Sequence, residues 1–350
     1  MKIKKGTSLC FDDVLLSPKY SDIRSRNEVD LSTNLTNIQK LQLPIVSSPM
    51  DTVTGAEMML ALHVQGGLGI LHRYNSIDQQ TQEVKTAQDM ARNRGYDNMI
   101  PAVAIGVSGD YHDRAVSLYE AGTRVFCVDV AHGHHVLTKL ALGKLRSTFG
   151  SDVHIIAGNV ATLEAFNDLS DWGADSVRVG VGGGSICSTR IQTGHGIPTL
   201  QSVLDCAQSD RDAQIIADGG IKNSGDAVKA LAAGADLVMF GSMLAGTDES
   251  PGEIMTTNNM TKIKTYRGMA SRAAQLDWRG KYSSDEGIST TIPYKGPVSV
   301  VLNSLEKGIR SGLSYSGARS INELQANAIF VRQTTNGLAE SKTHILDRKV

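Results

Sequence analysis

Residues 214–242 read QIIADGGIKNSGDAVKALAAGADLVMFGS, which is one complete strand–helix–strand unit. An apolar run from Gln214 to Ala217 ends in Asp218–Gly219–Gly220, and an amphipathic segment follows from Ser224 to Ala233. A second apolar run then spans Asp236 to Phe240. Apolar runs that alternate with helices are typical of parallel strands buried on both faces. The unit therefore predicts an α/β protein.

The same alternation recurs along the chain. Eight apolar runs are predicted as strands: Leu43 to Ser47, Leu68 to Leu71, Ala102 to Gly106, Val125 to Val130, His154 to Ala157, Ser176 to Val181, Gln214 to Ala217 and Asp236 to Phe240. Predicted helices between them include Ala56 to Val64, Tyr111 to Ala121, Val136 to Phe149, Leu163 to Trp172, Leu200 to Gln208 and Ser224 to Ala233. Eight units favour a (β/α)8 barrel over a doubly wound open sheet, the main alternative. We expect a single domain over residues 1–350.

Composition narrows the class of protein. The net charge of -1 gives no electrostatic argument for binding nucleic acid or a membrane surface. The chain has no apolar run of the length that spans a bilayer, and its N-terminus lacks the apolar stretch of a signal peptide. Cys10, Cys127, Cys187 and Cys206 have no paired spacing, which argues against disulfides and zinc. We expect a cytoplasmic protein.

The carboxyl ends of the predicted strands gather polar and glycine residues on one rim, where barrel enzymes carry their active sites. Asp218–Gly219–Gly220 and Gly241–Ser242 follow the last two strands, a place where backbone N–H groups commonly bind phosphate. A phosphorylated substrate is expected, and the Asp218 carboxylate suits ribose hydroxyls. Asp129, at another strand end, either binds a ligand or caps the next helix.

One cysteine stands out on this rim. Residues 182–190 read GGGSICSTR and place Cys187 on a glycine-rich loop after a predicted strand. A thiolate held on such a loop is a nucleophile suited to an electrophilic carbon. Cys10, Cys127 and Cys206 are interpreted as packing residues.

Other polar features receive plainer interpretations. Residues 257–297 form a long, irregular, polar segment, which predicts a mobile flap over the site, and Glu286 on it is a candidate general acid or base. The polar tail over residues 339–350 is expected to be poorly ordered. His132, His134 and His135 are interpreted as a polar loop, because no further ligand completes a metal site. Asp226 is assigned to a helix start.

Several motifs together resemble the IMP dehydrogenase/GMP reductase family over essentially the whole chain. They are Phe11–Asp12–Asp13–Val14–Leu15–Leu16, residues 47–54 (SSPMDTVT), residues 66–72 (GGLGILH), Ala157–Gly158–Asn159–Val160, the Cys187 loop, residues 217–221 (ADGGI), residues 241–247 (GSMLAGT) and Tyr266–Arg267–Gly268–Met269. The resemblance implies a (β/α)8 barrel, a homotetramer, a GMP or IMP substrate and a covalent thioimidate between cysteine and purine C2.

The resemblance also implies roles for individual residues. Catalytic roles fall to Cys187, Thr189 and Glu286. Substrate binding falls to Ser48, Met50, Ser185, Asp218, Gly219, Gly220, Gly241, Ser242, Tyr266, Gly268, Met269, Ala270 and Gly287. Cofactor binding, of NADPH or alternatively NAD, falls to Asp129, Val130, Ala131, Asn159, Val181, Gly182 and Tyr282. The carbonyls of Gly182, Gly184 and Cys187 resemble the family's potassium site.

The flap bears on which branch of the family the chain resembles. Dehydrogenases carry an Arg–Tyr pair about a dozen residues before the flap Glu–Gly, whereas here Arg279 precedes Gly280. Tyr282 instead matches the reductase spacing before Glu286–Gly287. The run from Leu71 to Ala102 leaves no room for the CBS regulatory modules that dehydrogenases usually insert there. The chain therefore resembles most a GMP reductase without CBS modules.

Other positions favour the alternatives. Tyr266–Arg267–Gly268 and the stretch from Ser47 to Thr54 are closer to dehydrogenases, and Ser283 replaces an arginine that reductases often have. An NAD-dependent IMP dehydrogenase is therefore the alternative activity. A nucleotide-binding regulator without activity and a barrel enzyme acting on another phosphorylated substrate are two further readings, and the second leaves Cys187 without a role.

Overall fold

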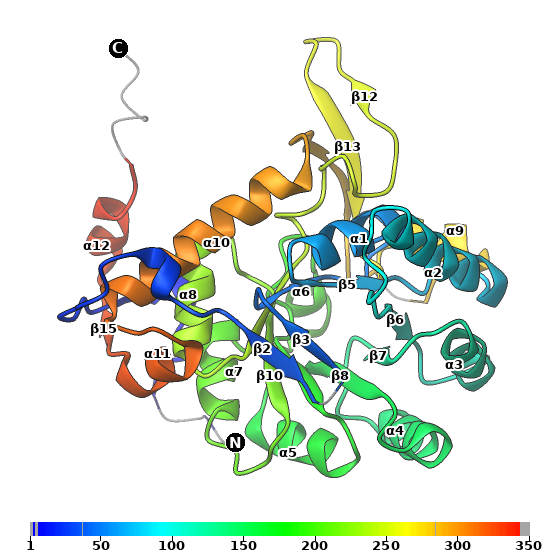
Figure 1. Cartoon of the computed structure of the whole chain (residues 1–350), viewed down its shortest axis with the longest axis horizontal. Coiled ribbons are helices and arrows are strands. Elements are labelled where there is room, and N and C mark those ends of the chain that lie inside the picture. The colour runs from blue at the N-terminus through cyan, green and yellow to red at the C-terminus, as the bar shows by residue number, and fades with distance from the viewer. Residues whose placement is uncertain (1–2, 4–5, 37, 284, 344–350) are drawn as a thin grey trace.

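The structure is a computed structural model that describes residues 3, 6–36, 38–283 and 285–343. Eight parallel strands close into a barrel, in the order β10-β11-β4-β5-β6-β7-β8-β9 (Figure 1). The strands are β4 (Ile45–Ser47), β5 (Leu68–Leu71), β6 (Ala102–Ile105), β7 (Val125–Asp129), β8 (His154–Val160), β9 (Ser176–Val179), β10 (Gln214–Asp218) and β11 (Leu237–Phe240). The predicted (β/α)8 barrel is confirmed, with all eight strands shifted by no more than a few residues at their ends.

Helices surround the barrel (Figure 1). They are α1 (Ala56–Val64), α2 (Ile77–Arg92), α3 (Tyr111–Glu120), α4 (Val136–Phe149), α5 (Leu163–Asp171), α6 (Thr189–Thr193), α7 (Thr199–Cys206), α8 (Ser224–Ala232), α10 (Val298–Tyr315), α11 (Ile321–Asn327) and α12 (Thr335–Glu340). Side-chain caps define several starts: Thr162 accepts the Ala165 N–H and Asn223 accepts the Asp226 N–H. Asp226 lies in the first turn of α8, as expected. Among the described helices, none is both long enough and apolar enough to cross a bilayer.

The connection after β5 is short. Ser76 and Gln79 form a capping box at the start of α2, so the helix begins almost directly where the strand ends. No CBS modules interrupt the barrel at this point, as the sequence predicts.

Alternate strand residues divide the core into two layers. Val125 and Cys127 of β7 point into the barrel, whereas Phe126 and Val128 pack outward against the helices. Leu237 and Met239 of β11 repeat the inward pattern. Most strands are therefore apolar on both faces, which explains the continuous apolar runs in the sequence, whereas β9 turns Ser176 and Arg178 to the inner face.

The amino-terminal end of the barrel is closed by a hairpin that the sequence analysis does not predict. Strands β2 (Thr33–Leu35) and β3 (Gln39–Leu41) pair across this end, and Leu35 and Leu41 pack on the inner layer (Figure 1). Beneath them His154 Nε2 lies 2.8 Å from Ser176 Oγ, and burial lowers the pKa of His154 to about 4. The barrel interior is thereby closed at this end.

The flap over residues 257–297 is not irregular, and that prediction is wrong. It contains β13 (Lys262–Arg267), α9 (Arg272–Arg279) and β14 (Ser289–Pro293), and β13 pairs antiparallel with both β14 and β12 (Met255–Thr256). The sheet projects from the barrel in Figure 1. The sequence signal for β13 is weak because the strand reads KIKTYR: its buried positions are Lys264 and Tyr266, and Ile263 lies on the other face. Apolar and polar residues therefore do not alternate as they do in a typical half-buried strand.

The carboxyl-terminal part of the chain packs back on its start. Strand β15 (Phe330–Arg332) pairs antiparallel with β1 (Val14–Leu16), and α12 follows. Of the tail predicted to be poorly ordered, residues 344–350 lie outside the described residues.

A Gly–Ala–Asp motif precedes both β9 and β11, at residues 173–175 and 234–236. In each copy the aspartate accepts a backbone N–H of the preceding strand: Asp175 Oδ2 from Ile155 (2.7 Å) and Asp236 Oδ2 from Ile215 (2.8 Å). Arg146 pairs with Asp175. Burial raises the pKa of Asp236 to about 6 from its ordinary value of 3.8.

Asp236→Asn is expected to stabilise the protein above pH 6. The native carboxyl holds its proton where the unfolded chain has lost it, so the free energy of unfolding falls as the pH rises through the range from about 4 to about 6, and the part of that fall between pH 5 and pH 8 is about 1.4 kcal/mol. The asparagine variant should lose that fall, because its amide oxygen still accepts the Ile215 N–H. Urea unfolding at pH 5 and pH 8 measures this. Asp175→Asn is the matched control, and it should destabilise because it leaves Arg146 without its carboxylate.

Candidate active site

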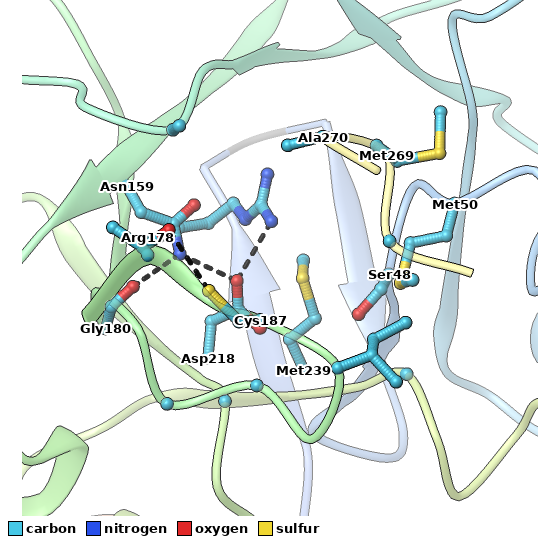
Figure 2. A pocket seen from close by; sticks show the side chains of 18 of the residues that line it. Ser48, Met50, Asn159, Arg178, Gly180, Cys187, Asp218, Met239, Met269 and Ala270 are labelled. Atoms are coloured by element: carbon cyan, nitrogen blue, oxygen red, sulfur yellow. Dashed lines mark hydrogen bonds and ion pairs between the residues drawn. The ribbon is translucent and has the colours of Figure 1, made fainter. Parts of the chain in front are cut away.

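A cavity of about 320 Å³ opens at the carboxyl ends of the strands. Its walls come from the loops after β4, β7, β8, β9, β10 and β11, and the flap covers one side. Figure 2 shows side chains from these separate elements pointing toward one another across the cavity. The rim predicted from the sequence therefore forms one site.

Nearly all the predicted site residues line this cavity. They are Ser48, Met50, Asp129, Val130, Ala131, Asn159, Val181, Gly182, Gly184, Ser185, Cys187, Thr189, Asp218, Gly219, Gly220, Gly241, Ser242, Tyr266, Gly268, Met269, Ala270 and Glu286. Gly287 is not among the lining residues, and its backbone forms isolated β-bridges with Cys187 and with Ser271. Tyr282 lies outside the lining, 45% exposed, with the Arg272 guanidinium over its ring.

Cys187 stands at the head of a short chain of hydrogen bonds. Its Sγ donates to Thr189 Oγ1 at 3.2 Å, and Thr189 Oγ1 donates to Glu286 Oε2 at 2.8 Å. The thiol is only partly buried, whereas burial raises the pKa of both Cys127 and Cys206 to about 12. Cys127 and Cys206 are therefore packing residues, as predicted, whereas Cys10, also predicted to pack, is partly exposed like Cys187, and its thiol is hydrogen-bonded to the Asp13 side chain. Of these two partly exposed thiols, Cys187 is the one that lines the cavity.

Backbone hydrogen bonds place Glu286 beside the cysteine loop. The Ile288 N–H donates to the Ile186 carbonyl (3.0 Å), and the Ser188 N–H donates to the Glu286 carbonyl (3.2 Å). Ser188 Oγ also donates to the carbonyl of Asp285 at 2.7 Å. Since two chain segments pair in this way, the flap carboxylate is held within reach of Thr189.

The opposite end of the cavity is rich in hydroxyl and N–H donors. Tyr266 is buried, its hydroxyl is hydrogen-bonded to the side chains of Ser185 and Ser242, and burial raises its pKa. A Cβ atom on Gly241 would lie 3.1 Å from that hydroxyl. Neutral donors grouped around an open turn suit a phosphate group.

A buried guanidinium joins the two halves of the site. Arg178 Nη1 donates to Asp129 Oδ1 at 2.5 Å. Its Nη2 donates to Asp218 Oδ2 at 2.9 Å (Figure 2). Burial alone would lower the pKa of Arg178, but the two carboxylates raise it well above its ordinary value. Asn159 Nδ2 adds a 2.8 Å hydrogen bond to Asp218. The two carboxylates are therefore fixed in position.

Close backbone packing beside Arg178 requires glycine. Gly180 has φ +146°, and a Cβ atom there would lie 1.9 Å from the Asp218 carbonyl oxygen. The chain after β9 can approach the chain after β10 only without a side chain at this position.

Sequence reasoning missed Arg178 and the aromatic wall beyond Asp129. The signal for Arg178 is a single charge inside the apolar run Ser176–Val179. The wall consists of Tyr74 stacked on Trp278 of α9, with ring centroids 4.2 Å apart, and the Arg73 guanidinium over both rings. Arg73 Nη2 also donates to the Asp129 carbonyl at 3.2 Å.

The histidine side chains of residues 132–135 and the carbonyls of the cysteine loop differ as candidate metal ligands. His134 Nε2 lies 2.7 Å from Asp168 Oδ2, and His135 Nδ1 accepts the Leu137 N–H. Within the described part of the chain, no group of three or more histidine, cysteine, aspartate or glutamate side chains could hold a metal ion. The predicted potassium ligands are backbone carbonyls, and the Cys187 N–H donates to the Gly184 carbonyl (3.1 Å), which curls that loop into one turn.

Comparisons with known proteins agree with this geometry. A family model for the IMP dehydrogenase / GMP reductase domain matches residues 8–344. An inosine-5′-monophosphate dehydrogenase from Nitrosopumilus maritimus is 35% identical, covering 98% of this chain and 99% of that protein. A GMP reductase from Leishmania major is 33% identical, covering 97% of each. A crystal structure of GMP reductase from Trypanosoma brucei in complex with guanosine 5′-monophosphate has a TM-score of 0.89 at 32% identity, covering 97% of this chain and 98% of that chain.

Arg178→Met is expected to lower the free energy of unfolding by about 3–5 kcal/mol, because it leaves the partly buried Asp129 and Asp218 close together without their shared cation. Urea unfolding at pH 7 measures the loss. Arg211→Met is the matched control: Arg211 also bridges two carboxylates, Asp171 and Asp210, but on the surface, so little change is expected. Equal stability of the Arg178 variant and wild type would contradict the account of this ion cluster.

Proposed function

Because the chain belongs to the IMP dehydrogenase/GMP reductase family and is an oxidoreductase, we propose that it is a GMP reductase. The reaction is the NADPH-dependent reductive deamination of GMP to IMP and ammonia. The observation that carries the proposal is the hydrogen-bonded chain from Cys187 through Thr189 to Glu286. The flap supports the same branch, since Arg279 is followed by Gly280 and not by tyrosine.

Cys187 begins the chemistry as a nucleophile. Its sulfur adds to C2 of the purine, and the thiol proton passes through Thr189 to Glu286. As the bond from C2 to the amino nitrogen breaks, Thr189 returns that proton to the nitrogen and ammonia leaves. The product is a thioimidate that joins Cys187 to C2. A hydride then adds to C2, the C–S bond breaks, and the cysteine recovers a proton, which releases IMP.

The other cavity residues hold the nucleotide. Ser185, Ser242 and Tyr266 donate hydrogen bonds to the 5′-phosphate, together with the backbone of Gly219 and Gly220. The Asp218 carboxylate, paired with Arg178, accepts from the ribose hydroxyls. The remaining assigned residues surround the base: Ser48, Met50, Gly268, Met269, Ala270 and Gly287. This arrangement sets C2 against Cys187.

NADPH supplies the hydride when it is bound. The far side of the cavity fits such a group, because Asp129 retains lone pairs for a ribose hydroxyl and the Tyr74 and Trp278 rings lie beside it. Val130, Ala131, Asn159, Val181 and Gly182 complete that side, and Tyr282 is proposed to join it. The carbonyls of Gly182, Gly184 and Cys187 are neutral oxygen donors and suit K⁺.

IMP dehydrogenase is the second candidate. The relatives include dehydrogenases, among them one from Cryptosporidium parvum that is 38% identical over 97% of this chain. The same thioimidate serves that reaction, in which hydride leaves C2 of IMP for NAD and water releases XMP. Glu286 and the flap, not Cys187, distinguish the two activities.

Two assays on the same preparation decide between the branches. With GMP and NADPH we expect the absorbance of NADPH at 340 nm to fall and IMP to form, whereas IMP and NAD should give no NADH. The opposite pattern would establish the dehydrogenase and overturn the proposal. Cys187→Ala should abolish either activity, because both need the covalent intermediate. Binding of GMP without turnover by the wild type would favour a regulator.

Glu286→Gln is expected to slow GMP deamination by roughly 10²–10⁴-fold, because the amide cannot take up the thiol proton. Release of ammonia in a single turnover measures this step. Asp285→Asn is the matched control: it changes the adjacent carboxylate but keeps the backbone carbonyl that Ser188 uses. If both variants release ammonia at the wild-type rate, Glu286 has no part in the proton transfer.

A further inference from the structure

The turn that follows β11 faces the cavity on one side and a lysine of the flap on the other. At its start, Gly241 and Ser242 face the cavity, and the N–H groups of Leu244 and Ala245 donate to the Gly241 carbonyl. At its back, the Lys295 ammonium donates to the carbonyls of Ser242 and Met243, the second at 3.1 Å. The proposed phosphate turn is therefore held from behind by a cation.

A second lysine extends this arrangement. Lys264 Nζ, on β13, donates to the carbonyl of Thr247 at 3.0 Å and to that of Ser250. Lys264 is only 2% exposed. Two ammonium groups from the flap thus bind carbonyls at both ends of one segment, residues 242–250.

The Lys295 ammonium is held by carbonyl dipoles, and no carboxylate of the described residues forms an ion pair with it. Burial lowers the pKa of its ammonium to about 8. The charged groups on the elements packed nearby are occupied elsewhere: Tyr294 donates to Asp248, Val298 donates to Glu249, Lys264 binds Thr247 and Ser250, and Lys262 lies over the Tyr294 ring. The protonation state of Lys295 therefore depends on what the turn binds.

The backbone around Lys295 connects the turn to the flap. The Lys295 N–H donates to the Gly246 carbonyl at 2.8 Å, and the Asp248 N–H donates to the Gly296 carbonyl at 3.0 Å. Lys295 also follows β14, which starts just after Glu286 and pairs with the strand that carries Tyr266. Lys295 is thus connected through the backbone to the proposed phosphate site and, through β14, to the flap segment that carries Glu286.

We propose that Lys295 is a positioning residue for the substrate phosphate, holding the Gly241–Ser242 turn in its binding conformation and fastening it to the flap. The inference rests on the proposed function, because it takes the ligand of this turn to be a nucleotide 5′-phosphate. A positive charge behind the turn also favours a dianion in front of it. Phosphate binding in turn favours the protonated lysine.

Calorimetric titration of the full chain with GMP and with IMP, between pH 7 and pH 9, tests this role. For the wild type we expect the Kd of both nucleotides to rise as the pH passes about 8. Lys295→Met should raise the Kd by roughly 10- to 100-fold at pH 7, since it removes hydrogen bonds from a charged group. Lys295→Arg stays charged throughout, so its Kd should change only with ionisation of the ligand itself.

Lys262→Met is the control, because it removes an exposed lysine of the same sheet and should leave the Kd unchanged. Circular dichroism checks that each variant is folded. If Lys295→Met does not fold, the comparison of the pH dependence of Kd between wild type and Lys295→Arg still tests the role of Lys295. Identical pH dependence in those two proteins, or tight GMP binding by a folded Lys295→Met variant, would overturn the role of Lys295 alone. Failure of wild-type protein to bind either nucleotide would overturn the proposed function as well.

Discussion

The charge of Arg178, buried at the centre of the rim, is the constraint on which the site depends. A guanidinium in that position is tolerable only with carboxylates at hydrogen-bond distance, so Asp129 and Asp218 must both remain in place. These three side chains come from β7, β9 and β10. Their contact therefore fixes the relative position of three strand ends, and with them the loop that carries Cys187.

The flap is attached to this rigid rim in two different ways. Near Cys187 the attachment is a ladder of backbone hydrogen bonds to residues 286–288. Near the Gly241–Ser242 turn it consists of two lysine ammoniums that bind carbonyls. The first kind is insensitive to side-chain identity, whereas the second depends on charge. The two ends of the cavity thus meet a flap that is held by different forces.

The sequence predicted the features that have a strong local signature. Buried parallel strands are continuous apolar runs, and Cys187 follows one of them on a glycine loop, so the barrel and most of the cavity could be foreseen. Arg178 could not, because its partners are distant in the chain and meet only when the barrel closes. The sheet around β13 escaped notice because its strands bury polar residues such as Lys264, which removes the alternation that marks a strand.

The backbone ladder at Glu286 has a consequence for how activities diverge in this family. Main-chain atoms of residues 285–288 make the hydrogen bonds that hold Glu286 against the cysteine loop. Substitution of flap side chains can therefore change the groups beside the cavity without loosening that attachment. Under the proposed function, a few residues of the flap set which reaction follows the addition of Cys187 to the purine.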